Sequence, residues 1–187
     1  KETDRLQSDY PYDVSKSASD LVCQSYSKTY NLKVGIIRCG NIFGPGDFNL
    51  KRLIPEVILS TLKNKRFVIR SNGKSTRDYV YVGDVVKAYV LLMNKLLASS
   101  TKLRTYNVSS NFNYSVKEVV NIILKYMKAS KLVPLIMNNS RQEINFQRLN
   151  YSKIKKELNW KPSIKIQKGI IDTIKWYKKY YKFLKKK

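Results

Sequence analysis

Apolar residues follow two kinds of spacing along this chain, and each kind predicts a different element. A spacing of three and four residues predicts helices, whereas short β-branched runs and strict alternation predict strands. The helical ranges are 12–31, 52–64, 82–97, 115–129 and two amphipathic stretches within 151–184. The other ranges are strands at 34–37 and 105–110, a loop at 40–46 and a hairpin around Ser-Asn-Gly within 67–82. Because strands alternate with helices, this order predicts an α/β fold.

Local signals add detail to these elements. Ser115, followed three residues later by Glu118, predicts a capping box at the start of the fourth helix. Asp84 is placed to cap the third helix. Trp160 and Trp176 stand among apolar residues, so we expect them in the core rather than as platforms for a ligand.

Length and composition exclude several classes of protein. The 187 residues suffice for one unit with a sizeable core and hold no apolar run long enough to cross a membrane. The chain starts without Met and without the apolar core of a signal peptide, so we expect a fragment or a processed product. It has no histidine and two cysteines, Cys23 and Cys39. No metal site is therefore expected, and both thiols are expected to be buried and free in the cytoplasm.

The net charge of +24 is the strongest global feature of the chain. A protein that binds nucleic acid or an anionic surface would carry such a charge. A composition rich in Lys, Asn, Ile and Tyr, with lysines spread over solvent-facing helix positions, also produces it. No helix-turn-helix, zinc-finger or aromatic-rich RNA-binding pattern is present. We therefore expect neither a nucleic-acid nor a membrane partner, and a basic binding module is the alternative from another functional class.

Six short motifs occur in an order that resembles one enzyme family. They are YDVSK (12–16), RCGNIFGPGD (38–47), RLIPEVI (52–58), IRSNGKSTRDYVYVGDVVKAYVLL (69–92), YNVSS (106–110) and KIKKELNWKPSIKIQKGIIDTIKWY (153–177). Together they resemble the extended short-chain dehydrogenase/reductases and, within that family, the nucleotide-sugar 4,6-dehydratases. The sequences of these motifs are most similar to those of the CDP-glucose enzymes. The resemblance extends from about Tyr10 to Tyr177.

The resemblance implies that this chain is part of a larger Rossmann-type enzyme. Such enzymes begin with a glycine-rich turn that seats the NAD pyrophosphate on a helix N-terminus, and the 7 glycines of this chain do not form that pattern. We expect the C-terminal part of a doubly wound parallel sheet, mainly in 10–45 and 78–110. A small mixed α/β substrate-binding subdomain would lie mainly in 46–77 and 111–180. Without its NAD-binding half, the chain alone is expected to be inactive.

Tyr12 and Lys16 are four residues apart and therefore share one face of the first helix. A phenol is a poor base at neutral pH, because its ordinary pKa is about 10, and a nearby ammonium favours the phenolate. By the resemblance, Tyr12 takes the proton of the sugar's C4 hydroxyl while a hydride passes to NAD⁺. Lys16 would activate Tyr12 and bind the nicotinamide ribose, and Cys39 would lie beside the same cofactor. Loss of water across C5 and C6 would then give a 4-keto-6-deoxy sugar.

The resemblance also assigns a set of residues to the sugar nucleotide, whose two phosphates favour fixed arginine forks. These residues are Asn41, Arg52, Leu53, Arg70, Arg77, Arg141 and Gln147. Arg77 and Arg141 match the pyrophosphate-binding arginines of the family, and Asn41 matches an asparagine of the same region. Arg52 and Leu53 match a loop at the nucleotide, while Arg70 and Gln147 would lie near the base and the ribose.

Two further expectations follow from the resemblance. The same tyrosine and lysine serve 4-epimerases and reductases of this family, and the acidic residue that would separate these activities from dehydration is not in this chain. Homodimerisation is expected through the helix that holds Tyr12, whose apolar stripe spans 14–26. We also expect an exposed sheet edge where the missing half would pair.

Overall fold

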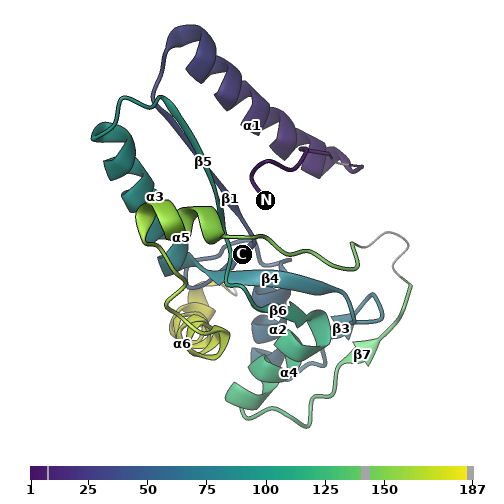
Figure 1. Ribbon diagram of the computed structural model, residues 1–187. Helices are drawn as coiled ribbons and strands as arrows, with labels where there is room; N and C mark the ends of the chain where they lie inside the picture. The colour runs from purple at the N-terminus through teal and green to yellow at the C-terminus, as the bar shows by residue number, and fades with distance from the viewer. Residues whose placement is uncertain (8, 140–143, 185–187) are drawn as a thin grey trace.

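The computed structural model describes residues 1–7, 9–139 and 144–184 of the chain (Figure 1). The fold is α/β, as the alternating pattern predicts. Within the described residues the strands form three small sheets, and each of these sheets contains a parallel pair. Within the described ranges no helix is both long and apolar enough to cross a membrane.

The first layer is a two-stranded parallel sheet between helices. β1 (Val34–Cys39) pairs with β5 (Leu103–Val108). α1 (Pro11–Tyr30) covers one face, and α3 (Val82–Leu97) covers the other together with α5 (Ser152–Leu158) (Figure 1). The buried apolar residues on the side of α3 and α5 are Val80, Val85, Ala88, Leu92, Leu96, Tyr106, Val108, Ile154 and Trp160.

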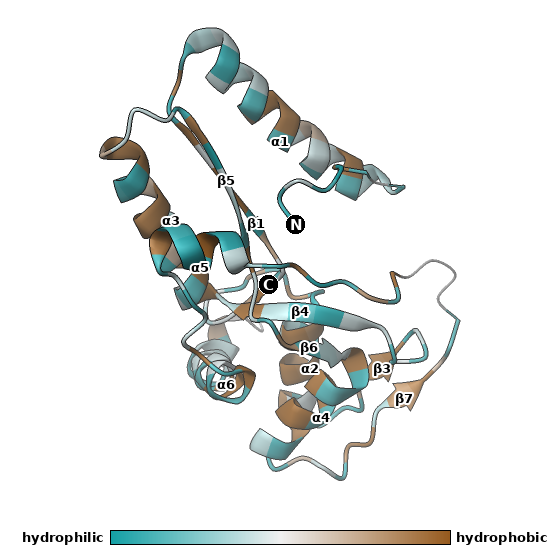
Figure 2. Ribbon diagram, viewed as in Figure 1, coloured by the Kyte–Doolittle hydropathy of each residue, from teal (hydrophilic) through white to brown (hydrophobic). Residues whose placement is uncertain are grey.

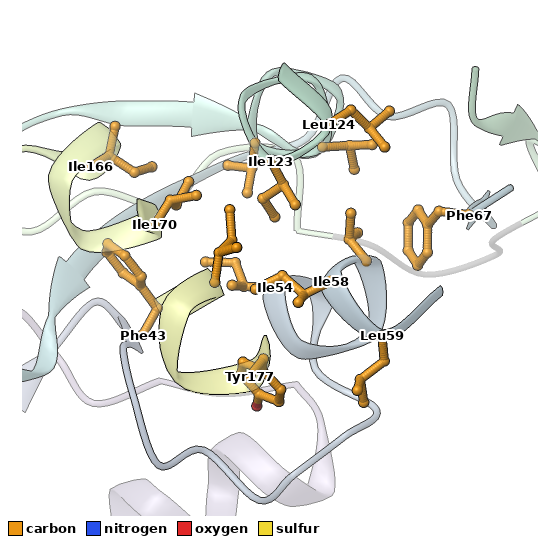
Figure 3. Packing of buried hydrophobic residues seen from close by; sticks show 14 of the residues in the cluster. Phe43, Ile54, Ile58, Leu59, Phe67, Ile123, Leu124, Ile166, Ile170 and Tyr177 are labelled. Atoms are coloured by element: carbon orange, nitrogen blue, oxygen red, sulfur yellow. The ribbon is translucent and has the colours of Figure 1, made fainter. Parts of the chain in front are cut away.

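The second layer joins a mixed sheet to three helices. β2 (Asn41–Phe43) runs parallel to β4 (Thr76–Tyr81), and β6 (Asn113–Ser115) runs antiparallel to β4. The helices α2 (Leu53–Leu62), α4 (Val116–Tyr126) and α6 (Ile166–Leu184) pack together around one apolar core (Figure 3). Figure 2 shows the apolar residues gathered on α2 and α4, which explains why these two helices follow the three- and four-residue spacing so closely.

The Ser-Asn-Gly segment does not form the predicted hairpin. β3 (Val68–Ile69) pairs in parallel with β7 (Leu135–Ile136), whereas the strand after the turn, β4, pairs with β2 and β6. The turn itself is present, since Gly73 has a φ of 75°. A turn signal determines only the local backbone, whereas strand partners are decided by which apolar faces are buried. The predicted loop at 40–46 is also partly wrong, because β2 occupies three of its residues.

Asp84 is not the cap that its position suggested. α3 begins at Val82, so Asp84 lies inside the first turn rather than before it. Its buried carboxylate instead accepts hydrogen bonds from Ser163 N (3.0 Å), Ser163 Oγ (2.5 Å) and Ile164 N (2.9 Å). Asp84 therefore ties α3 to the segment that precedes α6.

Other local predictions have mixed outcomes. The capping box is confirmed, with Ser115 Oγ accepting from Glu118 N (3.2 Å) and Ser115 N donating to Glu118 Oε2 (2.7 Å). Trp160 is buried, and Trp176 packs on the second core. The prediction of two buried thiols is wrong for Cys23, which is exposed because it lies on the outer side of α1.

Candidate active site

Tyr12 and Lys16 lie near the start of α1, with both side chains exposed. Lys16 Nζ lies 5.4 Å from the centre of the Tyr12 ring, a distance typical of a cation–π contact. The Tyr12 side chain is 66% exposed, so a small molecule could approach it. Pro11 occupies the first helical position, where its missing N–H costs nothing. The helix thus sets the phenol and the ammonium side by side, while their catalytic roles stay predictions.

An ion pair that the sequence patterns did not reveal holds α1 on the sheet. Arg38 of β1 places Nε 2.8 Å from Asp20 Oδ2 and Nη2 3.1 Å from Asp20 Oδ1. Burial opposes ionisation of Asp20, but hydrogen bonds from Arg38 and Gln24 outweigh it and hold the pKa of Asp20 below its ordinary value. In the sequence, Asp20 is an isolated acid within a helical stretch, a pattern that does not differ from that of a solvent-facing charge.

The position of Tyr12 follows from this anchor. α1 leads through a short loop into β1, which runs back along it, so the start of α1 and the end of β1 lie at the same edge of the sheet (Figure 1). Asp20 contacts Arg38 close to the end of β1. Tyr12 precedes Asp20 by two helical turns, about 12 Å, and therefore lies beyond the carboxyl ends of β1 and β5. Ligands of open α/β sheets bind at that edge.

Three consecutive residues of interest, 39–41, lie where β1 ends and β2 begins. Burial raises the pKa of the Cys39 thiol to about 12, and the carboxylate of Asp78 adds to this effect. Cys39 is therefore a neutral, half-buried packing residue, and its predicted proximity to the cofactor stays a prediction. A Cβ on Gly40 would lie 2.5 Å from the carbonyl oxygen of Asp78, so the backbone between β1 and β2 passes close to β4 there. Asn41 is exposed and stands opposite Tyr79 on β4.

Arg77 and Gln147 are brought together from distant parts of the sequence. Gln147 N donates to the carbonyl of Thr76 at 3.2 Å, beside Arg77 on β4. The Arg77 guanidinium donates to the carbonyls of Thr76 and Ile144, so the segment that leads to Gln147 lies along the strand. Arg141, the second predicted pyrophosphate ligand, lies outside the described residues.

The remaining predicted residues lie on the surface around the second layer. Arg52 precedes α2 and pairs with Asp47, with Nη1 3.3 Å from Oδ2. Leu53 follows it and is half-buried against the second core. Arg70 is exposed just after β3. Among the described residues no hydrogen bond or ion pair joins these side chains to Tyr12 or Lys16, so their meeting in one site stays a prediction.

In the part of the chain that the structure describes, no group of three or more Cys, Asp or Glu side chains converges as metal ligands would. Two cavities in that part, of about 200 and 660 Å³, are lined by residues other than the predicted ones.

The two edges of the first sheet differ in how their backbone groups are used. On the outer edge of β5, Asn107 N donates to Glu2 Oε1 (2.8 Å) and the carbonyl of Thr105 accepts from Lys153 Nζ (3.0 Å). On β1, Val34 N and Gly40 N donate toward β5, so alternation points the peptide groups of 35, 37 and 39 to the other side. No described residue pairs with that edge. β1 is thus open to a further strand, as the sequence analysis predicted.

Both helices that flank this open edge also expose apolar stripes. On α3 five side chains at helical spacing are each between 47% and 69% exposed: Val86, Tyr89, Val90, Met93 and Leu97. On α1 the stripe that the sequence predicted faces outward, while Asp20 and Ser27 are buried. The spacing correctly predicted the helix, but the apolar face is turned to solvent rather than to the sheet.

Comparison with known proteins gives consistent matches. A family profile described as GDP-mannose 4,6 dehydratase matches residues 1–173. The dTDP-D-glucose 4,6-dehydratase of Mus musculus is 30% identical over 91% of this chain and 48% of its own length. The crystal structure of dTDP-glucose 4,6-dehydratase from Bacillus anthracis in complex with NAD is 27% identical, with a TM-score of 0.89 over 100% of this chain and 57% of that one.

A second solved structure agrees with the first. The dTDP-glucose 4,6-dehydratase of Streptomyces venezuelae, with NAD bound, is 26% identical and has a TM-score of 0.87 over 97% of this chain and 55% of that one. The present chain spans about half the length of the curated relatives it matches.

Proposed function

Because this chain belongs to the GDP-mannose 4,6 dehydratase family, within the NAD-dependent epimerases and dehydratases, we propose that it is the C-terminal part of a nucleotide-sugar 4,6-dehydratase. The observation that carries the proposal is the pairing of Tyr12 with Lys16 at the ligand-binding edge of the sheet. The similar solved enzymes bind NAD and are dTDP-glucose dehydratases. Two thiols that form no disulfide fit a reducing compartment, which supports a cytoplasmic enzyme.

In this proposal Tyr12 removes the proton from the C4 hydroxyl of the sugar. Its exposed phenol can reach a substrate that lies over the carboxyl ends of the strands. Lys16, whose Nζ lies 5.4 Å from the centre of the Tyr12 ring, is proposed to assist this proton transfer. The Asp20–Arg38 pair acts by position, since it sets the angle at which α1 presents both side chains.

The residues present fit one end of an NAD molecule. Tyr12 and Lys16 would hold the nicotinamide ribose, because they are exposed beyond the strand ends where a dinucleotide crosses the sheet. When bound, NAD accepts a hydride from the sugar and returns it to the same sugar. A cradle for the pyrophosphate is not among these residues and belongs to the other half of the sheet.

That other half would attach to the open edge of β1. A parallel strand there would use the free peptide groups of β1, and its helices would cover the exposed stripe of α3. This arrangement also accounts for the predicted division into a Rossmann part and a substrate-binding subdomain. The stripe of α1, which would face away from that sheet, is then available for the predicted homodimer.

The sugar nucleotide would be held by the second layer. Arg77 and Gln147 already lie together, and Arg141 would add a second guanidinium for the diphosphate. Asn41, Arg52, Leu53 and Arg70 would complete the contacts with the phosphates, the ribose and the base. The sequences of the motifs favour CDP-glucose, whereas the similar enzymes named above are dTDP-glucose dehydratases. A direct comparison of the two substrates must therefore decide which base is bound.

The test uses the polypeptide that combines this chain with its NAD-binding half. Tyr12→Phe is expected to lower the rate of water loss from CDP-glucose or dTDP-glucose by about 10²–10⁴-fold. Tyr30→Phe, an exposed tyrosine at the other end of α1, is the matched control and should keep its activity. Product formation is followed by mass spectrometry.

Two results would overturn the proposal. Equal activity of Tyr12→Phe and the control would remove the catalytic assignment. Tight binding of any polyanion, with no preference for a sugar nucleotide and with a steep loss in salt, would favour the basic binding module.

A further inference from the structure

A cavity of about 660 Å³ lies between the C-terminal ends of α2 and α4 and the side of α6. It is bordered by the last turn of α2, the segment 127–132 that follows α4, and Lys178 of α6. The lining residues are Thr61, Leu62, Asn64, Met127, Lys128, Ala129, Ser130, Lys131, Leu132 and Lys178. α2 begins at the predicted nucleotide contacts and ends at this cavity, ten residues or about 15 Å away. The cavity is therefore separate from the candidate active site.

The charge on the lining is of one sign. Lys128, Lys131 and Lys178 are its charged lining residues, and no lining residue is acidic. None of the three ammonium groups has a hydrogen bond or an ion pair with any residue that the structure describes. In the whole sequence no acid occurs from 119 to 142, and the last one in the chain is Asp172. Among the described residues, the three charges therefore have no ion-pair partner.

Lysines near helix ends often serve as caps for free carbonyl groups, but these lysines do not. At the end of α4 the carbonyls of Ile123, Leu124 and Lys125 already accept from backbone N–H groups of 127–129. At the end of α2 the carbonyls of Leu59, Ser60 and Thr61 accept from the backbone of 63–65. Because both ends are closed by the main chain, the ammonium groups are left available for a ligand.

The other lining atoms fit an anion with an apolar part. Ser130 and Asn64 offer side-chain donors, and Leu62, Met127 and Leu132 form an apolar border. Cavities that hold small molecules usually measure about 300–1,000 Å³ and combine an apolar lining with a few polar groups. Lysine ammonium groups are compact donors that suit phosphate oxygens. We propose that this cavity binds a phosphate-bearing small molecule.

The test measures where pyrophosphate, the simplest ligand of this class, binds to the full chain. The variant Lys128→Gln/Lys131→Gln/Lys178→Gln removes the three cavity charges. The matched control, Lys28→Gln/Lys95→Gln/Lys161→Gln, removes three exposed lysines elsewhere and lowers the net charge equally. Affinity is measured by calorimetry, and the amide signals of 128–132 are followed by NMR, because pyrophosphate also resembles part of the proposed substrate.

The cavity variant is expected to lose about tenfold or more in affinity at this site, whereas the control should lose less than about threefold. Circular dichroism checks that both variants remain folded, as expected for exposed side chains. Equal losses in the two variants, or no shift of the 128–132 signals, would overturn the proposal. Binding of a uridine polymer or of anionic phospholipid vesicles that is tighter than binding of pyrophosphate, and equally tight in the cavity variant and the parent, would also overturn the proposal.

Discussion

The Asp20 carboxylate of α1 and the Arg38 guanidinium of β1 form a two-point ion pair, with Oδ2 2.8 Å from Nε and Oδ1 3.1 Å from Nη2. Both side chains are largely buried, at 9% and 18% exposure. The N-terminal segment strengthens the arrangement, since the Glu2 carbonyl accepts from Arg38 Nη1 at 3.0 Å. The pair ties α1 to β1, and among the described residues neither apolar core includes a residue of α1.

Asp20→Asn is expected to lower the free energy of unfolding by about 1–3 kcal/mol at pH 7. Despite burial, the hydrogen bonds from Arg38 and Gln24 keep the pKa of Asp20 below its unfolded value, so folding favours the ionised form. The contribution is therefore complete above pH about 4 and is lost as the pH falls through the lowered pKa. Urea unfolding of both proteins between pH 3 and 7 should show the difference shrinking in acid.

Asp13→Asn is the control for this prediction. Asp13 lies in the first turn of the same helix and has no ion pair among the described residues. Its substitution should change stability by less than about 0.5–1 kcal/mol. A stability difference between Asp20→Asn and the parent that stays constant down to pH 3 would contradict the assignment.

Asp84→Ala should be one of the most destabilising substitutions of an acid in this chain. It leaves the N–H groups of Ser163 and Ile164 without their acceptor in a partly buried place. We expect a loss of about 2–4 kcal/mol, measured by urea unfolding. Asp172→Ala, which removes an exposed pair with Lys168, should cost less than about 1 kcal/mol. Similar losses at the two positions would mean that the tie between α3 and the 163–164 segment contributes little.

Most of the helices could be predicted from the sequence, because their apolar spacing reflects a core formed within this chain. α4 is an example, with its capping box and the buried residues Val119, Val120 and Ile123. Strand partners could not be predicted in the same way. β3 pairs with β7 rather than with β4, and this pairing depends on residues more than sixty positions away in the sequence.

The candidate site shows the same division. The side-by-side placement of Tyr12 and Lys16 follows from helix geometry alone and could be predicted. The outward direction of the α1 stripe could not, because spacing identifies an apolar face without saying whether its partner lies within this chain. The ion pair of Asp20 and Arg38 could not be predicted from the sequence either, because an ion pair between distant residues produces no periodic pattern.

Gly40→Ala is expected to destabilise the fold by about 2–3 kcal/mol. The added Cβ would lie 2.5 Å from the carbonyl oxygen of Asp78, and backbone atoms cannot move aside cheaply. At Gly46 nothing lies within 4 Å, so Gly46→Ala should cost only about 1 kcal/mol from its φ of 84°. Thermal unfolding of the two variants compares them directly. A smaller shift for Gly40→Ala than for Gly46→Ala would show that the backbone at Gly40 moves away from β4 without cost.

The two cysteines should differ in reactivity. Burial, together with the Asp78 carboxylate, raises the pKa of Cys39 to about 12. At pH 8 only about one Cys39 thiol in ten thousand would then be ionised. Iodoacetamide should therefore modify the exposed Cys23 and leave Cys39 intact, as read by peptide mass spectrometry. Denaturant should make both react, and rapid labelling of Cys39 in the folded chain would contradict its burial.

Hydrogen exchange along β1 can test directly whether a further strand pairs there. The N–H groups of Ile36 and Arg38 point to β5 and should exchange slowly in this chain by itself. Those of Gly35, Ile37 and Cys39 point to the open edge and should exchange fast. In the enzyme that includes the proposed NAD-binding half, the second set should become protected while the first stays unchanged. Alternate residues of β1 thus serve as each other's controls. Equal protection of both sets from hydrogen exchange in the isolated chain would show that the edge of β1 is already paired.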